Sequence, residues 1–152
     1  METLAGRFQQ SVTQLNRMFA SIIIEQLDTP VTMTQLFMLH WIRTSGKCRL
    51  TMLADKLEVK PSAVTVMIDR LEKAELVRRI HDESDRRVIL VELTEHGQLL
   101  IQRAKEIREE MIGAYLSQLD EGEARIVTEV LEKMVRSMQQ APTHPQPYNK
   151  NT

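Results

Sequence analysis

The fold can be inferred from three segments of the chain, Thr51-Met-Leu-Ala-Asp-Lys-Leu57, Lys60-Pro-Ser-Ala-Val-Thr-Val-Met-Ile-Asp-Arg-Leu71 and Asp85-Arg-Arg-Val-Ile-Leu-Val-Glu-Leu-Thr94. The first two have the apolar spacing of short helices. The third is rich in β-branched residues and follows residues 76–81, with which it can pair as a hairpin across the polar residues 82–85. The sequence therefore predicts two short helices followed by a two-stranded, arginine-rich hairpin.

Helices are also expected on the amino-terminal side of this region. Apolar residues recur at helical spacing from Leu4 to about Leu27, and Asp28-Thr-Pro30 ends that helix. Thr32-Met-Thr-Gln35 is a capping box that starts a second helix, which runs to about Thr44. Its apolar residues lie on most sides, which is typical of a buried helix. Cys48-Arg-Leu50 is expected to form a short strand.

Local signals predict where the later elements begin and end. Thr51 is expected to cap the first short helix, and Pro61 suits the first turn of the second, which should reach about Ala74. The paired strands are expected over residues 76–81 and 88–93. Thr94 is expected to cap a long helix over about 95–118, and a capping box at residues 120–123 starts a last helix that ends near Met138.

Composition limits the class of protein. The chain has 152 residues, of which 42% are hydrophobic and 27% charged, so it can form a folded core. Its one cysteine, Cys48, excludes an intramolecular disulfide and fits a reducing compartment. No apolar stretch is long enough for a membrane span, and the first residues lack the pattern of a signal peptide. We therefore expect a cytoplasmic protein without a membrane partner.

The two short helices and the basic hairpin together make a winged helix-turn-helix, which inserts its second helix into the major groove of duplex DNA. Spacing assigns Leu53, Leu57, Val64, Met67, Ile68 and Leu71 to the packed side of the two helices. On the free side, Ser62 and Thr65 can exchange hydrogen bonds with base edges, and Ala63 and Val66 can contact a thymine methyl group. Lys60 and Arg70 are better placed for phosphates.

The hairpin, or wing, carries four arginines, Arg78, Arg79, Arg86 and Arg87. An arginine at a wing tip fits the narrow minor groove, where the negative potential is strongest. Asp85 lies two residues before Arg87 and can hold its guanidinium through a bidentate pair. A solvated hairpin with surface ion pairs is the alternative interpretation. The predicted DNA contacts are Lys60, Ser62, Ala63, Thr65, Val66, Arg70, Arg79, Asp85, Arg86 and Arg87.

Along nearly its whole length, the chain resembles the MarR family of transcriptional regulators. The signature D-x-R-x5-L-T is present from Asp85 to Thr94. Further matches are V-T-x-x-Q at residues 31–35, L-A-x-x-L at 53–57 and S-A-V-T-x-x-I-D-R-L-E at 62–72. Two positions depart from the family pattern: Glu75 stands where glycine is frequent, and Lys60 stands where a capping residue is common.

The resemblance implies a mainly α fold with a small β-hairpin wing, organised as one structural domain. Residues 1–30 would form an amino-terminal dimerisation helix, 31–94 the winged helix-turn-helix, 95–140 the carboxy-terminal dimerisation helices and 141–152 a flexible tail. Each subunit of the homodimer would bind half of a pseudo-palindromic operator. By analogy with the family, Arg87 enters the minor groove and Asp85 positions it.

Many members of this family release DNA when a small aromatic or lipophilic anion binds between the dimerisation helices and the winged region. A cationic or imidazole side chain can meet a carboxylate, and Met or Trp can flank a ring. The candidate effector contacts are Arg17, Met18, Met38, His40, Trp41 and Met52. The alternative is that Met and Trp at helical spacing simply fill the core.

Other function classes receive little support. Cys48 lies outside the first helix, where peroxide-sensing members of the family carry their cysteine, and a buried, inert thiol is expected there. The histidines are scattered, so we expect no metal site. No catalytic motif or cofactor-binding loop occurs, so we expect no enzyme and no cofactor. A repressor relieved by a ligand is favoured; an activator, or a winged-helix module that binds another protein, are the alternatives.

Overall fold

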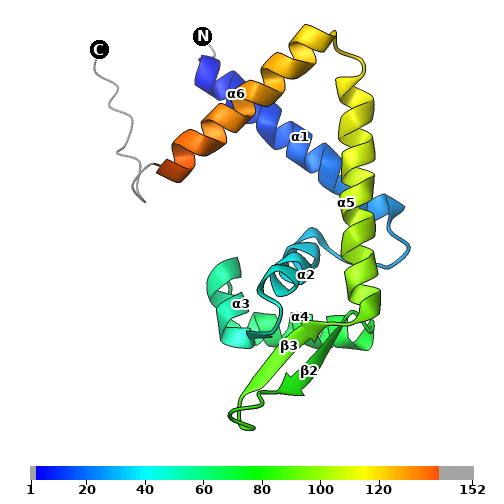
Figure 1. Ribbon diagram of the computed structural model, residues 1–152, viewed down its shortest axis with the longest axis vertical. Coiled ribbons are helices and arrows are strands. Elements are labelled where there is room, and N and C mark those ends of the chain that lie inside the picture. The colour runs from blue at the N-terminus through cyan, green and yellow to red at the C-terminus, as the bar shows by residue number, and fades with distance from the viewer. Residues whose placement is uncertain (1–2, 141–152) are drawn as a thin grey trace. The chain divides into compact units, whose positions relative to one another are not determined.

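The computed structural model describes residues 3–140, so the tail expected over residues 141–152 lies outside the described part of the chain. The chain forms two compact units, one ending at Glu109 and the other beginning at Glu110. The elements, drawn in Figure 1, are α1 (Leu4–Gln26), α2 (Met33–Ser45), β1 (Cys48–Arg49), α3 (Leu50–Leu57), α4 (Pro61–Lys73), β2 (Val77–His81), β3 (Ile89–Leu93), α5 (Glu95–Leu116) and α6 (Glu121–Gln140). The expected class, mainly helical with a small sheet, is confirmed.

The capping box before α2 forms as the sequence predicts. The Thr32 hydroxyl accepts a hydrogen bond from the Gln35 amide at 3.2 Å, and the Gln35 side chain accepts one from the Thr32 amide at 2.8 Å. Satisfying both amides fixes the start of the helix. The helix then contributes Leu36, Met38, Leu39 and Ile42 to the core, the last three without exposed surface. Helix α3 and strand β3 pack on it.

Helix α3 begins earlier than expected. Its N-cap is Arg49, which makes no side-chain capping bond, and Thr51 lies inside the first turn. Leu50 belongs to the helix and not to the strand, which ends at Arg49. The prediction that Thr51 caps α3 is therefore wrong. A strand that passes directly into a helix leaves no residue between them for a polar cap.

Helix α4 begins at Pro61, as predicted, and its N-cap Lys60 makes no side-chain capping bond. Proline at this position loses nothing, because its missing N–H would have no partner inside the helix. Val64, Ile68 and Leu71 are buried on one side of α4. The packed side inferred from the spacing is thus the buried side.

Three antiparallel strands form the sheet, in the order β1-β3-β2. Cys48 pairs with Val91, and Val91 pairs with Arg79 on its other side. Cys48, Val77, Val91 and Leu93 are buried, so this row faces the core. We call β2, β3 and the connecting residues 82–88 the wing, and α2 to β3 the winged unit. In Figure 1 the wing extends beyond the helices of this unit.

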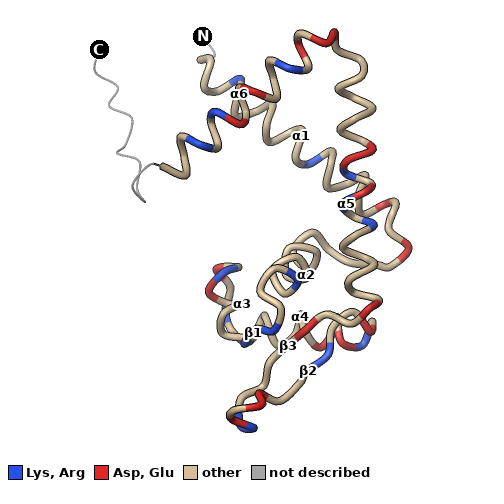
Figure 2. Tube along the Cα trace, in the orientation of Figure 1, with Lys and Arg blue, Asp and Glu red and all other residues tan. Residues whose placement is uncertain are grey.

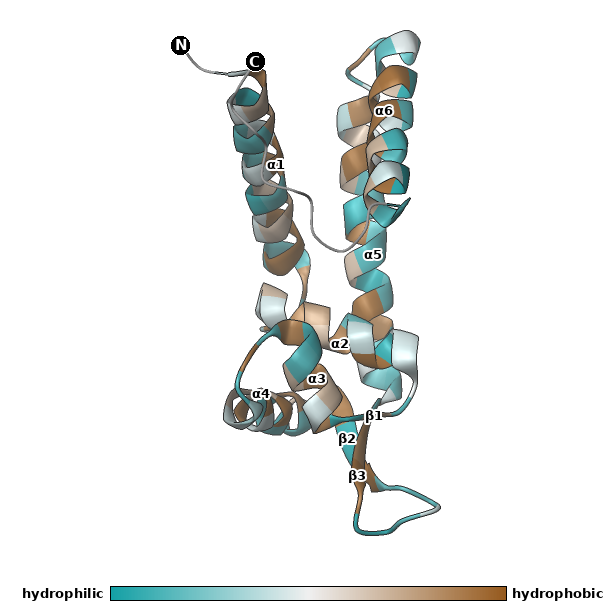
Figure 3. Ribbon diagram, turned by 90° about the vertical axis from the view of Figure 1, so that its left-hand side faces the viewer, coloured by the Kyte–Doolittle hydropathy of each residue, from teal (hydrophilic) through white to brown (hydrophobic). Residues whose placement is uncertain are grey.

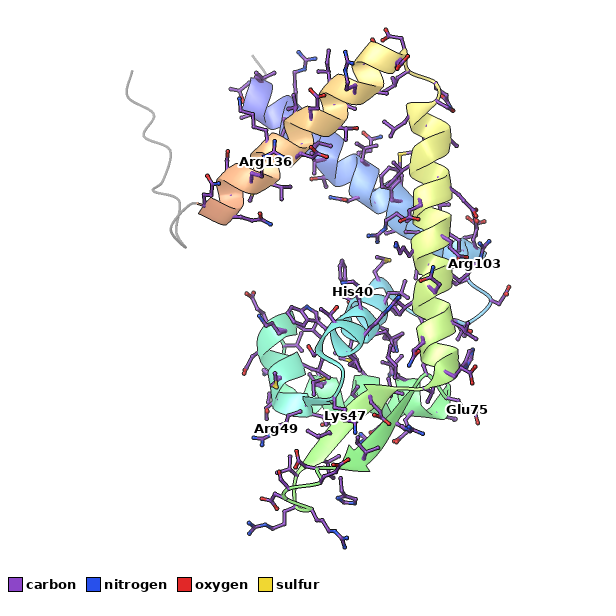
Figure 4. The ribbon with its side chains drawn as sticks, in the orientation of Figure 1. His40, Lys47, Arg49, Glu75, Arg103 and Arg136 are labelled. Atoms are coloured by element: carbon purple, nitrogen blue, oxygen red, sulfur yellow. The ribbon has the colours of Figure 1, made fainter. Side chains whose placement is uncertain are left out.

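The junction of α4, the sheet and α5 depends on two backbone positions. Glu75, labelled in Figure 4, has a φ of 58°, the left-handed conformation that glycine adopts more easily. The Thr94 hydroxyl donates to the Glu75 carbonyl at 2.6 Å and accepts from the Gly97 amide at 3.0 Å. A Cβ atom on Gly97 would lie 2.0 Å from the Leu76 carbonyl oxygen. This close approach permits only glycine and fixes the start of α5.

The second unit contains α6, an amphipathic helix without a buried residue. At its start the predicted capping box forms. The Glu123 amide donates to the Asp120 carboxylate at 2.9 Å, and the Asp120 amide donates to the Glu123 carboxylate at 3.2 Å. Figure 3 shows the mixture of apolar and polar positions along the helix. Its exposed apolar residues are Ile126, Val127, Val130, Leu131, Met134, Val135 and Met138. Such a stripe is typical of a surface that packs against another chain.

No helix among residues 3–140 combines the length and the hydropathy that a membrane crossing requires.

Candidate nucleic-acid interface

One side of α4 is open to solvent over its first two turns. Ser62, Ala63, Thr65 and Val66 are exposed, whereas Val64 between them is fully buried. The Thr65 hydroxyl donates to the Pro61 carbonyl at 3.2 Å and keeps its lone pairs available as acceptors. This face offers one hydroxyl-rich strip beside one apolar strip, which is the combination that can distinguish base edges in the major groove.

Both ends of α4 carry exposed cations. Lys60 stands at the amino-terminal end and Arg70 in the last turn. No side chain caps the first turn, in which the Ala63 amide donates to the Lys60 carbonyl at 2.9 Å, so the positive end of the helix is exposed to an anion. The arrangement suits contacts to phosphates on either side of a groove into which α4 is inserted.

The pair expected at the wing tip is present. Arg87 Nε lies 3.1 Å from Asp85 Oδ1, and the terminal Nη2 lies 3.4 Å from Oδ2. The Arg87 amide also donates to Asp85 Oδ1, at 3.1 Å. These bonds, first from the guanidinium and then from the amide, hold the pKa of Asp85 below its ordinary value. The Arg87 side chain is nevertheless 92% exposed, so it is oriented without being covered.

A second carboxylate shapes the same loop. Asp82 Oδ1 accepts bonds from the Ser84 amide at 2.8 Å, from the Asp85 amide at 3.2 Å and from the Ser84 hydroxyl. The hydroxyl bond is the largest cause of a lowered pKa for Asp82. His81 Nδ1 lies 2.8 Å from the Arg86 carbonyl oxygen. The sequence interpretation missed these three side chains, although D-x-S-D is a recognisable Asx-turn pattern.

Arg79 differs from the other wing arginines because it points at α4. Its guanidinium lies 2.6 Å from Asp69 and also pairs with Glu72, and its amide donates to Glu72 at 3.1 Å. Burial tends to lower the pKa of Arg79, but the bonds to both carboxylates outweigh it, so that the pKa is raised. Only 25% of the side chain is exposed. Arg79 therefore ties β2 to the helix that carries the candidate base contacts.

Figure 2 shows the resulting distribution of charge, with basic and acidic positions together at the wing tip, where the basic residues are arginines. Arg86 and Arg87 are exposed there beside Asp82 and Asp85. The acidic residues hold the loop in place through hydrogen bonds, whereas the arginines extend from it. The candidate contacts on α4 and at the tip belong to one packed unit.

The six candidate effector contacts lie on three helices. Arg17 and Met18 are exposed on α1, His40 is exposed on α2 and Met52 is exposed on α3. Met38 is fully buried in the core. Trp41 is half-buried, and Lys56 Nζ lies 4.7 Å from the centre of its ring, a cation–π contact between α2 and α3.

Cys48 is buried, and burial raises the pKa of its thiol. A thiol in this state is a poor nucleophile at neutral pH. Residues 3–140 contain no group of three or more His, Cys, Asp or Glu side chains arranged to hold a metal ion.

Known proteins share both the sequence pattern and the fold. The MarR family model matches residues 31–89. The HTH-type transcriptional repressor MdtR of Bacillus subtilis is 35% identical over 137 residues, which cover 90% of this chain and 88% of that protein. The crystal structure of YusO from Bacillus subtilis is similar with a TM-score of 0.73 at 34% identity, covering 88% of this chain and 95% of that one. A mutant of S. aureus MepR bound to an oligodeoxyribonucleotide is similar with a TM-score of 0.69 at 25% identity, covering 90% and 98%.

Proposed function

Because this chain belongs to the MarR family of DNA-binding transcription regulators, we propose that it is a homodimeric repressor of a pseudo-palindromic operator. Each winged unit binds one half-site. Helix α4 enters the major groove and the Arg87 side chain enters the adjacent minor groove. Regulation follows from occupying the promoter and requires no catalytic step.

One observation carries this proposal. Arg87 is 92% exposed while Asp85 holds its guanidinium at both Nε and Nη2. An arginine that only keeps a surface loop in contact with water can adopt many orientations. An arginine that inserts into a narrow groove must adopt one. Fixing the side chain beforehand lowers the entropy that binding must remove. Thr65 and Ser62 then read base edges, and Lys60 and Arg70 hold the flanking phosphates.

The dimer is supported by apolar surface that a single chain leaves uncovered. Helix α6 exposes Val130, Leu131 and Val135, and α1 exposes Leu4 and Phe8. Burying such residues against a second copy removes them from water. A two-fold axis between copies presents two α4 helices to successive major grooves, which requires an operator with matching symmetry.

The sign of regulation and the effector are separate parts of the proposal. MdtR is named a repressor, and this chain is similar to it over nine-tenths of its length. We propose a small aromatic or lipophilic anion as the effector, with Arg17 and His40 as the cationic and imidazole contacts. Met18, Trp41 and Met52 would flank its ring, and Met38 would support them from the core. Thermal shift with aromatic and lipophilic carboxylates tests this part separately.

Selection of bound fragments from random and genomic DNA tests the main proposal. We expect the selection to enrich a pseudo-palindrome. In a plot of the logarithm of affinity against the logarithm of salt concentration, we expect a negative slope of about 0.9 for each phosphate contact. A protein-interaction module would instead enrich no sequence and show a flat salt response. A promoter fusion carrying the selected operator then distinguishes a repressor from an activator.

A further inference from the structure

The sheet has a second face that neither the core nor the wing tip uses. Register places Cys48, Val91 and Arg79 in one row on the face that packs against the helices. The neighbouring row, Arg49, Leu90 and Ile80, therefore lies on the opposite face, because side chains alternate along a strand. Arg78 and Glu92 form the next pair on that face. We call this surface the outer face of the sheet.

The outer face carries more cationic than acidic side chains, Lys47, Arg49 and Arg78 against Glu92. Arg49 and Arg78 are exposed on it, and exposed Lys47 directly precedes β1. Arg78 is paired with Glu92 at 2.6 Å, and the Glu92 side chain is only 17% exposed. Neither Lys47 nor Arg49 has an ion-pair partner within 4.0 Å among residues 3–140. Figure 4 labels both beside the sheet, on the β1 side.

This charge continues to the wing tip. Arg49 is opposite Leu90, which pairs with Ile80 one position before His81, where β2 ends. Its charge also acts on the tip carboxylates. The pKa of Asp82, lowered chiefly by the Ser84 hydroxyl, and that of Asp85, lowered chiefly by Arg87, are both lowered further by Arg49. Arg49 therefore lies close enough to the wing tip for its charge to act there, so the cations beside β1 and the arginines of the tip can reach the same stretch of a duplex.

We propose that this outer face binds the sugar–phosphate backbone of the duplex that flanks each operator half-site, through Lys47, Arg49 and Arg78. The inference rests on the proposed function. When α4 occupies the major groove and Arg87 the next minor groove, the outer face lies on the side of the wing that is turned away from α4. The DNA beyond the half-site passes on that side.

The chemistry of the face favours phosphate over other partners. Phosphate contacts need cations and carry no base information, and the unpaired Lys47 and Arg49 are such cations. Between them and Arg78 lie the half-buried Leu90 and Ile80, which provide no hydrogen bonds that could read a sequence. The contacts therefore add affinity and salt dependence without changing the preferred operator.

Two duplexes test the proposal. The short duplex contains the selected operator and ends at the wing contacts, and the long duplex adds about ten base pairs, one helical turn, of unrelated sequence on each side. For the unmodified protein we expect tighter binding and a steeper salt dependence on the long duplex. The double variant Lys47→Ala/Arg49→Ala is expected to lose this difference, with the slope reduced by about 0.9 for each phosphate contact removed, and to bind the short duplex as the parent does.

A control variant separates a local contact from the general effect of charge. Lys105→Ala/Arg108→Ala removes the same charge from exposed positions on α5 and should retain the gain from the flanks. Arg78 is left unchanged in these variants, because it is already paired with Glu92. Circular dichroism and sedimentation are used to check that the variants fold and dimerise as the parent does.

The remaining outcomes overturn the inference. An equal loss on both duplexes would assign Lys47 and Arg49 to the half-site or to the wing conformation, and no loss on either would make them solvated cations. If the outer face instead binds an acidic protein, the flanks bring no gain even for the unmodified protein. Failure of the unmodified protein to bind the short duplex would refute the proposed function itself, which is a distinguishable result.

Discussion

Arg87 illustrates how one side chain can be both fixed and accessible. We expect Arg87→Ala to weaken operator binding by about 1–3 kcal/mol, the usual cost of losing a specific arginine contact. Folding and dimerisation should not change, because the side chain is 92% exposed. Fluorescence anisotropy measures the affinity. Arg87→Lys, which keeps the charge but loses the planar fork, should recover only part of it. A variant that binds as well as the parent would show the wing assignment to be wrong.

The carboxylates of the wing tip make a prediction about pH. The pKa values of Asp82 and Asp85 are both lowered in the folded protein. A lowered folded pKa means that the stabilisation is fully present above the ordinary aspartate pKa of about 3.9 and is lost as the pH falls through the lower, folded value. We therefore expect the Ser84 and Arg87 amides to lose protection from exchange only in that acidic range, as measured by NMR.

Asp82→Asn provides the control for this titration. The amide keeps the oxygen that accepts from Ser84 but cannot be protonated in this range. The Ser84 amide of this variant should therefore stay protected from exchange at acidic pH. The Arg87 amide of the same variant should still lose protection as Asp85 is protonated. Equal loss of protection at Ser84 in parent and variant would place the cause elsewhere.

Between α4 and the sheet, a strained backbone position can be relieved. Glu75 has a φ of 58°, and a side chain in this conformation costs up to about 1 kcal/mol relative to glycine. Glu75→Gly should raise the free energy of unfolding by up to that amount, because the bond from Thr94 goes to the main-chain carbonyl and is retained. Urea denaturation measures the change. Gly97→Ala, which places a Cβ against the Leu76 carbonyl, should lower the free energy of unfolding. A Glu75→Gly protein less stable than the parent would show that Glu75 is not strained.

The wing and α4 are coupled through Arg79. Its partners Asp69 and Glu72 are both partly exposed, so solvent screens the pairs and their contribution to stability should be at most about 1 kcal/mol. We expect Arg79→Met to reduce operator affinity by more than this small loss of stability explains, because β2 is no longer tied to α4, which carries the proposed base contacts. Anisotropy on the short duplex and urea denaturation give the two quantities.

Arg78→Met is the matched variant for Arg79→Met. It removes an arginine from the same strand but breaks a pair within the sheet, with Glu92, and none with α4. On the short duplex it should bind nearly as the parent does. If both variants bind equally, the tie between β2 and α4 has no role in recognition.

For the whole molecule, the proposed homodimer depends on the exposed apolar face of α6. Leu131→Glu places a charge on a face that a homodimer buries, which costs more than the contact alone. We expect monomers in sedimentation equilibrium and a large loss of operator affinity, because one winged unit retains only one half of the contacts. Lys133→Glu, at an exposed charged position on the same helix, is the control. A stable Leu131→Glu dimer would move the interface away from this face.

Much of this protein can be read from short stretches of the chain. The boxes at Thr32 and Asp120, proline at the start of α4 and the Asp85–Arg87 pair all depend on residues at most four positions apart. Residues this close in sequence contact each other in almost any fold that preserves the helix or turn in which they lie. Apolar spacing likewise identified the buried side of α4, because a helix repeats regularly.

Other features required the packed chain. Arg79 is predicted to contact DNA, and its pairs with carboxylates seven and ten residues back are a further role that no local pattern indicates, because they depend on β2 folding against α4. The start of α3 at Leu50 and the outer-face row Arg49–Leu90–Ile80 depend equally on strand register. Interactions between neighbours are set by local geometry, whereas pairing between distant segments is set by the burial that brings their elements together.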